Sequence, residues 1–172
     1  MRSLLFAVLI SSGVQAAALI PDGSRSVVFG HGSAQVALPT EMKVISSEGA
    51  LNAQFGAAND HLLELSFNPS PPGEMVDGRE FVRAQAASRS AELKSGSDRV
   101  LFMEPAGDIE RAGKTFRVVH WQIGVRAGVF VLTITAPIPM SAELDDFLEV
   151  GLPMAVNSVG VVGPNQSFKP TP

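Results

Sequence analysis

Residues 115–137 hold the longest run of β-branched and aromatic residues in the chain, and their alternation predicts a β-hairpin. If the turn is centred on Arg126 and Ala127, a single register pairs the most apolar residues across the two arms. The predicted pairs are Ile123 with Phe130, Trp121 with Leu132, and Val119 with Ile134. The opposite face carries Val, Thr, His and Gln side chains, so we expect it to lie nearer water.

A second hairpin is predicted from residues 51–57 and 61–67, which alternate in the same way. Asn59 and Asp60 lie between the arms, and both residue types tolerate the left-handed backbone of a tight loop. The predicted pairs are Leu51 with Phe67, Ala53 with Leu65, and Phe55 with Leu63. Further short strands are predicted at residues 26–29, 34–38, 43–46 and 99–104, the last of them ended by Pro105.

Two helices are predicted. Asp77 can cap a helix over residues 78–95, with Glu80 reaching back to the cap. The apolar stripe of this helix would be Val82, Ala86 and Leu93. Ser141 can cap a last helix, whose apolar residues recur at helical spacing. Pro153 should kink or split that helix, because the proline ring clashes with the carbonyl of the preceding turn.

Residues 1–16 are predicted to be a secretory leader, with Arg2 as its charged start and an apolar stretch over residues 4–10. Small residues favour cleavage after Ala16, with Ala18 as the second choice. An uncleaved anchor is the alternative, but the apolar stretch is shorter than the ~20 residues of a membrane span. We therefore expect a periplasmic or secreted protein. Its organisation would be a single α+β domain over residues 17–160 and a flexible tail over residues 161–172.

The composition excludes several classes of protein. The chain has no cysteine, so disulfide scaffolds, lipobox anchors, thiol nucleophiles and cysteine-based metal sites are excluded. The formal charge of the chain is −4 and its sequence contains no basic cluster, so nucleic acid is not an expected partner. No transmembrane segment is expected in the mature chain, because no other stretch is long and apolar enough.

No catalytic or cofactor motif is present in the sequence. His31, His61 and His120 lack the spacings typical of metal sites, so we interpret them as three unrelated histidines. There is no GxSxG elbow. We expect neither a cofactor nor a metal, and we expect the protein not to be an enzyme. Convergence of His61 or His120 with a serine and a carboxylate in a pocket would reopen the enzyme hypothesis.

Two segments are the predicted partner-binding sites. The first is a proline-rich loop, whose stiffness lowers the entropy cost of docking. Its candidate residues are Pro69, Pro71, Pro72, Glu74 and Met75. The second is a charged connection over residues 107–113, with candidates Asp108, Ile109 and Arg111. Loops on a rigid scaffold commonly carry binding sites, although plain connectors are the alternative for both segments.

The element order of strands, helix, strand, hairpin and helix predicts an α+β fold, in which two main helices pack on an antiparallel sheet. Together with short motifs at residues 36–39, 65–67, 128–133 and 156–159, this order resembles the PsbP-like superfamily. That superfamily includes the extrinsic photosystem II subunit, a Ran-binding import factor and envelope proteins of the DcrB type. The resemblance implies an α/β/α-like sandwich and a binding or assembly role without shared catalytic residues. Pro153 departs from an uninterrupted last helix.

These observations predict a non-enzymatic periplasmic or secreted protein that binds another envelope or secreted protein. It would act as an accessory factor, an assembly factor or an immunity-type inhibitor. The alternative is a periplasmic protein that binds a small ligand or a metal in the cleft between sheet and helices. In that case His31, His61 or His120 would contribute to the site.

Overall fold

The computed structural model describes residues 23–56, 58–70, 77–96, 98–139 and 141–162. The chain begins with β1 (Ser24–Phe29), β2 (Ala34–Pro39), β3 (Lys43–Ser46), β4 (Leu51–Phe55) and β5 (His61–Pro69). It continues through α1 (Gly78–Ser88), β6 (Lys94–Ser95), β7 (Arg99–Arg111), β8 (Lys114–Val125) and β9 (Gly128–Pro137). It closes with α2 (Ala142–Asp146), the π-helical turn η1 (Phe147–Gly151), α3 (Leu152–Ser158) and β10 (Gly160–Val161).

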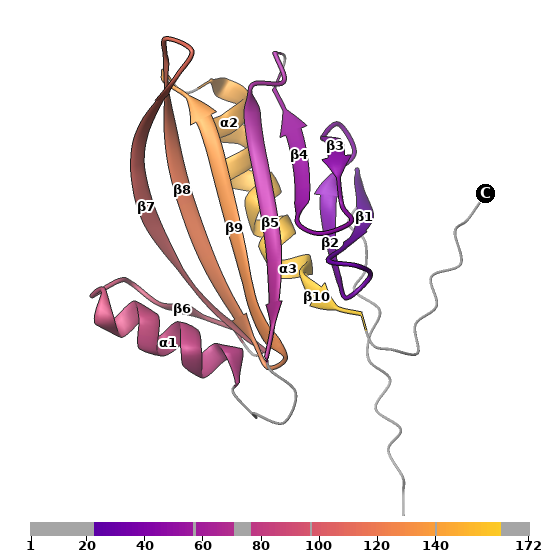
Figure 1. Ribbon diagram of the computed structural model, residues 1–172, viewed down its shortest axis with the longest axis vertical. Helices are drawn as coiled ribbons and strands as arrows, with labels where there is room; N and C mark the ends of the chain where they lie inside the picture. The colour runs from indigo at the N-terminus through magenta and orange to yellow at the C-terminus, as the bar shows by residue number, and fades with distance from the viewer. Residues whose placement is uncertain (1–22, 57, 71–76, 97, 140, 163–172) are drawn as a thin grey trace, which may run out of the picture.

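The strands form two sheets, and every strand pair is antiparallel. The larger sheet has the order β3-β4-β5-β9-β8-β7-β6, and the smaller one has the order β1-β2-β10. In Figure 1, α2 and α3 lie behind the larger sheet and α1 lies at its lower end. The α+β class, with an antiparallel sheet and helices packed on it, is confirmed.

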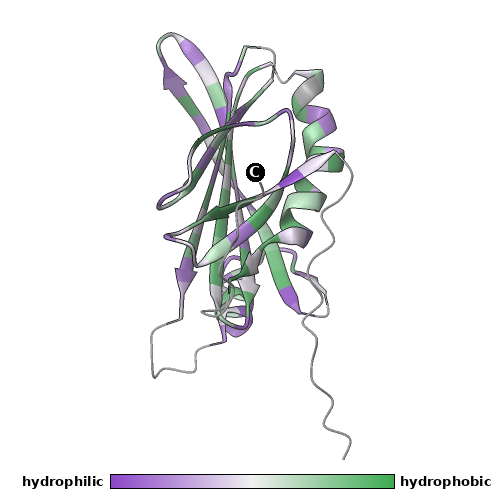
Figure 2. Ribbon diagram, turned by 90° about the vertical axis from the view of Figure 1, so that its right-hand side faces the viewer, coloured by the Kyte–Doolittle hydropathy of each residue, from purple (hydrophilic) through white to green (hydrophobic). Residues whose placement is uncertain are grey.

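The β8–β9 hairpin has the predicted register. All three apolar pairs are present, including Trp121 with Leu132. Trp121 is 7% exposed and belongs to a core that joins both sheets to α2, η1 and α3. Figure 2 shows this helical layer along one side of the larger sheet, with apolar residues in both. Alternation therefore located the core face of this hairpin correctly.

The predicted register of the β4–β5 hairpin was wrong by two residues. Leu51 pairs with Leu65 and Phe55 pairs with His61. The loop is longer than expected, because Gly56 and Asn59 have φ angles of 82° and 51°. The Asn59 N–H donates to the Gly56 carbonyl at 3.0 Å. A shift of two residues keeps the same side chains on the core face, so the burial pattern could not distinguish the two registers.

Helix α1 begins as predicted and ends earlier. The Asp77 side chain accepts a hydrogen bond from the Arg79 N–H at 2.9 Å, as a capping residue should. The Glu80 carboxylate contacts Arg83. The helix ends at Ser88 because Ser90 adopts φ 53°. The Ser90 N–H donates to the Ala87 carbonyl and the Ala91 N–H donates to the Ala86 carbonyl. This is a Schellman motif without glycine, and the sequence pattern did not reveal it.

Strand β7 does not end at Pro105, so that prediction was wrong. A bulge between Pro105 and Gly107 shifts the register, and the strand continues to Arg111. The predicted charged connection over residues 107–113 is therefore the last five residues of β7 plus a two-residue turn. Ala112 and Gly113 form that turn with φ angles of 50° and 72°, the positive values of a type I′ turn.

The C-terminal helical segment starts at its predicted cap, since Ser141 Oγ accepts from the Leu144 N–H at 3.2 Å. The π-helical turn ends at Gly151, two residues before Pro153, and α3 then continues to Ser158. Val161 pairs with Ala34 of β2, so the residue at which the predicted tail starts belongs to a strand. Residues 163–172 and the predicted leader lie outside the described residues. In the described part of the chain, no helix combines the length and apolar character needed to cross a bilayer.

Candidate functional site

The two faces of the larger sheet differ in what covers them. One face packs against α2, η1, α3 and the smaller sheet. On the other, the outer face, α1 packs Val82 and Ala86 against Val100 and Phe102. The half of the outer face beyond α1 contains a hollow of about 360 Å³, here called the outer hollow. Its lining residues are Leu62, Glu64, Ile109, Arg111, Val118, His120, Thr133 and Thr135.

A row of polar side chains crosses the outer face at this point. Glu64 lies opposite Thr133, Thr133 opposite His120, and His120 opposite Glu104. Residues that lie directly opposite one another point to the same face of a sheet. His120 Nδ1 lies 2.8 Å from Thr133 Oγ1, so the threonine fixes the imidazole ring. Glu104 pairs with Arg89 at the end of α1 at 3.2 Å, which compensates its charge.

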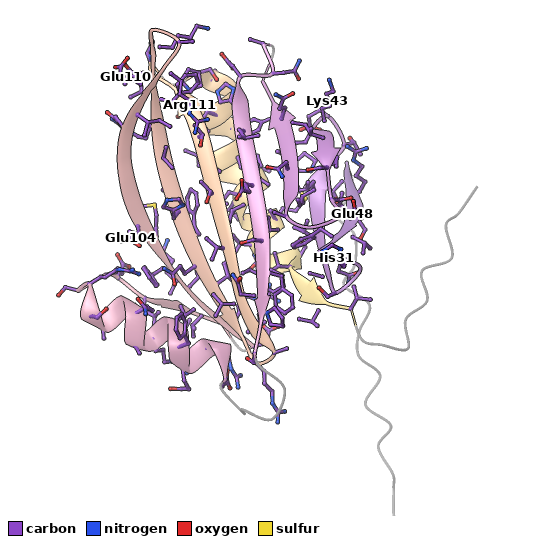
Figure 3. All side chains as sticks on the ribbon, in the orientation of Figure 1. His31, Lys43, Glu48, Glu104, Glu110 and Arg111 are labelled. Atoms are coloured by element: carbon purple, nitrogen blue, oxygen red, sulfur yellow. The ribbon has the colours of Figure 1, made fainter. Side chains whose placement is uncertain are left out.

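The bulge in β7 decides which side chains border the outer hollow. Before the bulge, Phe102 lies opposite Gln122 on the outer face. After it, Ile109 lies opposite Phe116 on that face, so the outward positions change from even to odd numbers. A strand without the extra residue would turn Ile109 and Arg111 to the other face. Figure 3 shows Arg111 near the turn between β7 and β8, with Glu104 farther down β7.

The charges at this end of the sheet are only partly compensated. Asp108 forms an ion pair with Arg117 at 3.1 Å, and this carboxylate raises the pKa of Arg117. Among the residues that the structure describes, neither Arg111 nor Glu64 has an ion-pair partner. The hollow therefore offers one cation and one carboxylate to a bound molecule, beside the half-buried imidazole of His120.

The structure separates the predicted binding residues into four groups. Ile109 and Arg111 line the outer hollow, whereas Asp108 is paired with Arg117 and does not. Pro69 ends β5 opposite Gly128 and lines a second hollow of about 390 Å³ beside Phe81. Pro71, Pro72, Glu74 and Met75 lie outside the described residues.

The two hollows adjoin each other along the outer face. Gln122 and Val131 line the second hollow, and each lies two residues along its strand from a residue of the first, His120 and Thr133. The predicted residues Pro69, Ile109 and Arg111 consequently border one surface. Sequence reasoning missed Glu64 and Thr133, and it named His120 only for the alternative of a ligand or metal site or an enzyme. Their only signal was the polar alternation opposite the core residues of the hairpin.

A larger cleft of about 650 Å³, here called the helix cleft, lies on the core side, between η1 and the ends of β1, β2 and β4. Its lining residues are Gly23, Pro39, Glu41, Met42, Phe55, Gly56, Asp146, Phe147, Val150, Gly151 and Met154. A π-helical turn holds one residue more than an α-helical turn, and such turns are frequent at functional sites. Here the turn carries Val150, which is 66% exposed.

One serine, one histidine and one carboxylate do come together beside this cleft. His61 Nε2 lies 3.0 Å from Ser141 Oγ, and His61 Nδ1 lies 3.0 Å from Asp60 Oδ1, although the latter contact lacks hydrogen-bond geometry. His61 is 2% exposed and stacks on Phe55, with ring centroids 4.9 Å apart. Ser141 Oγ also accepts the capping hydrogen bond of α2. None of the three residues lines the helix cleft or either of the two hollows on the outer face. Their contacts connect β5 to the start of α2.

The three histidines lie in three different places. His31 is exposed in the turn after β1, with φ 54°, and Figure 3 shows it on the far side of the molecule from Arg111. His61 is in the core and His120 is on the outer face. Within the described ranges, no three His, Asp or Glu side chains gather as a metal site requires.

Comparisons with known proteins reveal similarity of fold. Neither a family description nor a curated protein matches the chain. A crystal structure from Bacteroides thetaiotaomicron VPI-5482 matches 85% of this chain with a TM-score of 0.64 and 12% identity. The match covers 51% of that protein, so this chain spans about half its length, and at this identity the likeness concerns the fold alone.

The solution structure of cyanobacterial PsbP (CyanoP) from Synechocystis sp. PCC 6803 aligns with 87% of this chain and 96% of its own, at 12% identity. Its TM-score is 0.32, which is too low to argue from.

Proposed function

We propose that this protein is a non-enzymatic binding factor that acts in the periplasm or the secreted fraction, where it binds another envelope or secreted protein. Accessory, assembly and immunity-type inhibitory roles belong to this class. One observation carries the proposal. Beyond α1, the outer face of the sheet is open in the described part of the chain, and a bulge adds an apolar and a cationic side chain to it.

The lining of the outer hollow indicates what kind of partner would fit. Leu62, Ile109 and Val118 offer apolar contact, while Arg111 can pair with a carboxylate. His120 and Thr133 can exchange hydrogen bonds with a peptide backbone. Apolar contacts surrounded by polar groups are typical of protein interfaces. The expected partner segment therefore carries an apolar residue next to an acidic one.

The location and the finer fold belong to the same proposal. The predicted leader supports a place outside the cytoplasm. The element order and short motifs of the sequence support a PsbP-like α/β/α arrangement. A member of that superfamily is expected to bind or assemble other proteins, because its members share no set of catalytic residues.

The test starts with affinity capture of the tagged mature protein from its own envelope and culture fluid. A candidate partner is then purified and its affinity is measured against four variants. Ile109→Asp and Arg111→Glu alter the outer hollow. Ile45→Asp and Lys43→Glu make the same changes on β3, at the far edge of the same sheet, where Ile45 is 53% exposed.

The expected result is a 1:1 complex that each hollow variant weakens by roughly tenfold or more, while the β3 variants leave it unchanged. Equal losses of affinity in the hollow variants and in the β3 variants would contradict the proposal that the outer face binds the partner. Failure to find any stoichiometric protein partner would contradict the binding function itself.

The alternative function, binding of a small ligand or metal between sheet and helices, is favoured only by the size of the helix cleft. None of His31, His61 and His120 lines that cleft. A shift in melting temperature on addition of a transition metal, abolished by substitution of one of these histidines, would favour the alternative.

A further inference from the structure

The helix cleft has the lining of a site for an apolar segment that carries a positive charge. Six of its side chains are apolar: Pro39, Met42, Phe55, Phe147, Val150 and Met154. Glu41 and Asp146 are exposed carboxylates in the same lining, and in the described residues neither has an ion-pair partner. Apolar surface with an unpaired charge at its border is typical of a binding surface.

The chain enters the fold at this cleft. Gly23 is itself a lining residue, and its carbonyl accepts a hydrogen bond from the Thr40 N–H at 3.0 Å. Asp22 directly precedes it, and the five residues before Asp22 are apolar: Ala17, Ala18, Leu19, Ile20 and Pro21. Ile20 lies three residues before Gly23, so extended chain can carry it up to about 10 Å from there.

The other end of the chain leaves the fold at a different place. The Val162 N–H donates to the Ser33 carbonyl at 2.9 Å, next to the start of β2. The cleft residue Pro39 is at the opposite end of that strand, a separation of about 17 Å for six residues. The point where the chain enters the fold, Gly23, is therefore nearer to the cleft than the point where it leaves, Val162.

We infer that residues 17–20 of the chain bind in the helix cleft, with Leu19 and Ile20 against the side chains of η1. Removal of the leader after Ala16 creates an α-ammonium group on Ala17. That group is complementary to the carboxylates of Glu41 and Asp146. Leader removal thereby completes the packing of η1, and the cleft is an intramolecular docking site. This inference rests on the proposed removal of the leader, concerns the core side of the molecule and does not depend on the proposed partner face.

The absence of cysteine makes a direct test possible. Ile20→Cys is combined with Val150→Cys in the mature chain, and the rate of intramolecular disulfide formation is measured under mild oxidation. The matched control combines Ile20→Cys with Glu64→Cys, an exposed position on the outer face. The cleft pair is expected to close at least tenfold faster than the control. Equal rates would overturn the inference.

A second measurement does not depend on cysteine chemistry. The double variant Leu19→Asp, Ile20→Asp should lower the melting temperature by about 3 °C or more, because two apolar side chains leave the cleft. Phe168→Asp makes a similar change in the C-terminal segment and should leave the melting temperature unchanged.

Binding of the apolar dye Nile red reports whether the cleft is open. Deletion of residues 17–20 should increase dye binding several-fold, and equal binding with and without the segment would show a free ligand cleft and overturn the inference.

Discussion

The two faces of the larger sheet are built from alternate residues of the same strands, yet the rest of the chain covers them to different extents. Trp121 on the core face is covered by elements from both ends of the chain, whereas its neighbour His120 lies on an outer face that α1 covers only in part. Alternation determines which residues share a face. Whether that face becomes a core or an open surface depends on what the rest of the chain places over it.

The largest expected effect concerns the core face. Trp121→Ala should lower the free energy of unfolding by about 3–5 kcal/mol, because it removes a buried aromatic side chain and leaves a cavity. Urea denaturation followed by far-ultraviolet circular dichroism measures the change. A near-unchanged urea midpoint would show that Trp121 is not in the core, and the contrast between the two faces would then fail.

The next effect tests how α1 covers its half of the outer face. Gly78 of α1 lies so close to the sheet that a methyl group there would collide with the backbone carbonyl of Gly128. Gly78→Ala should therefore cost about 1–3 kcal/mol, despite the better helix propensity of alanine. Gly49→Ala is the control, since nothing lies within 4 Å of its added methyl group. Equal stabilities of the two variants would show that α1 does not depend on this close approach.

A smaller effect concerns the charge at the start of α1. The hydrogen-bonded Arg79 lowers the pKa of Asp77 to about 2, from an ordinary value of 3.8. Because the folded-state pKa is the lower one, the resulting stability is present above about pH 4 and is lost as the pH falls through about 2.

Asp77→Asn keeps a capping side chain but removes the charge, so it should cost well under about 1 kcal/mol at pH 7. The difference between variant and wild type should shrink as the pH falls below about 4 and be largely lost at pH 2. Urea titrations at pH 7, 4 and 2 measure it, with Asp108→Asn, a carboxylate paired with Arg117, for comparison. A difference that stays constant with pH would assign the effect to the cap geometry alone.

The smallest effect is expected on the open half of the outer face. His120→Ala removes a half-buried ring and its contact with Thr133, and should change the free energy of unfolding by about 0.5 kcal/mol or less. The same urea titration measures it. A loss above about 2 kcal/mol would mean that the outer hollow is part of the stabilising core, and the contrast between the two faces would fail.

The sequence by itself determined the α+β class, the register of the β8–β9 hairpin, and the caps at Asp77 and Ser141. These features depend on neighbours within a few residues or on a two-residue turn, so local periodicity and capping chemistry suffice. It also identified Ile109 and Arg111 as candidates, although it assigned them to a loop.

The tertiary structure decided the features that local pattern leaves equivalent. The β4–β5 hairpin could slip by two residues without moving any side chain to the other face, and only the pairing of β5 with β9 and the wide loop at Gly56 select one register. The bulge at Pro105 exists because β7 continues to pair with β8 beyond a residue that has no N–H to donate. The outer hollow and the helix cleft both join residues that are far apart in sequence, so their shapes depend on how whole elements pack and cannot be inferred from any single stretch of the chain.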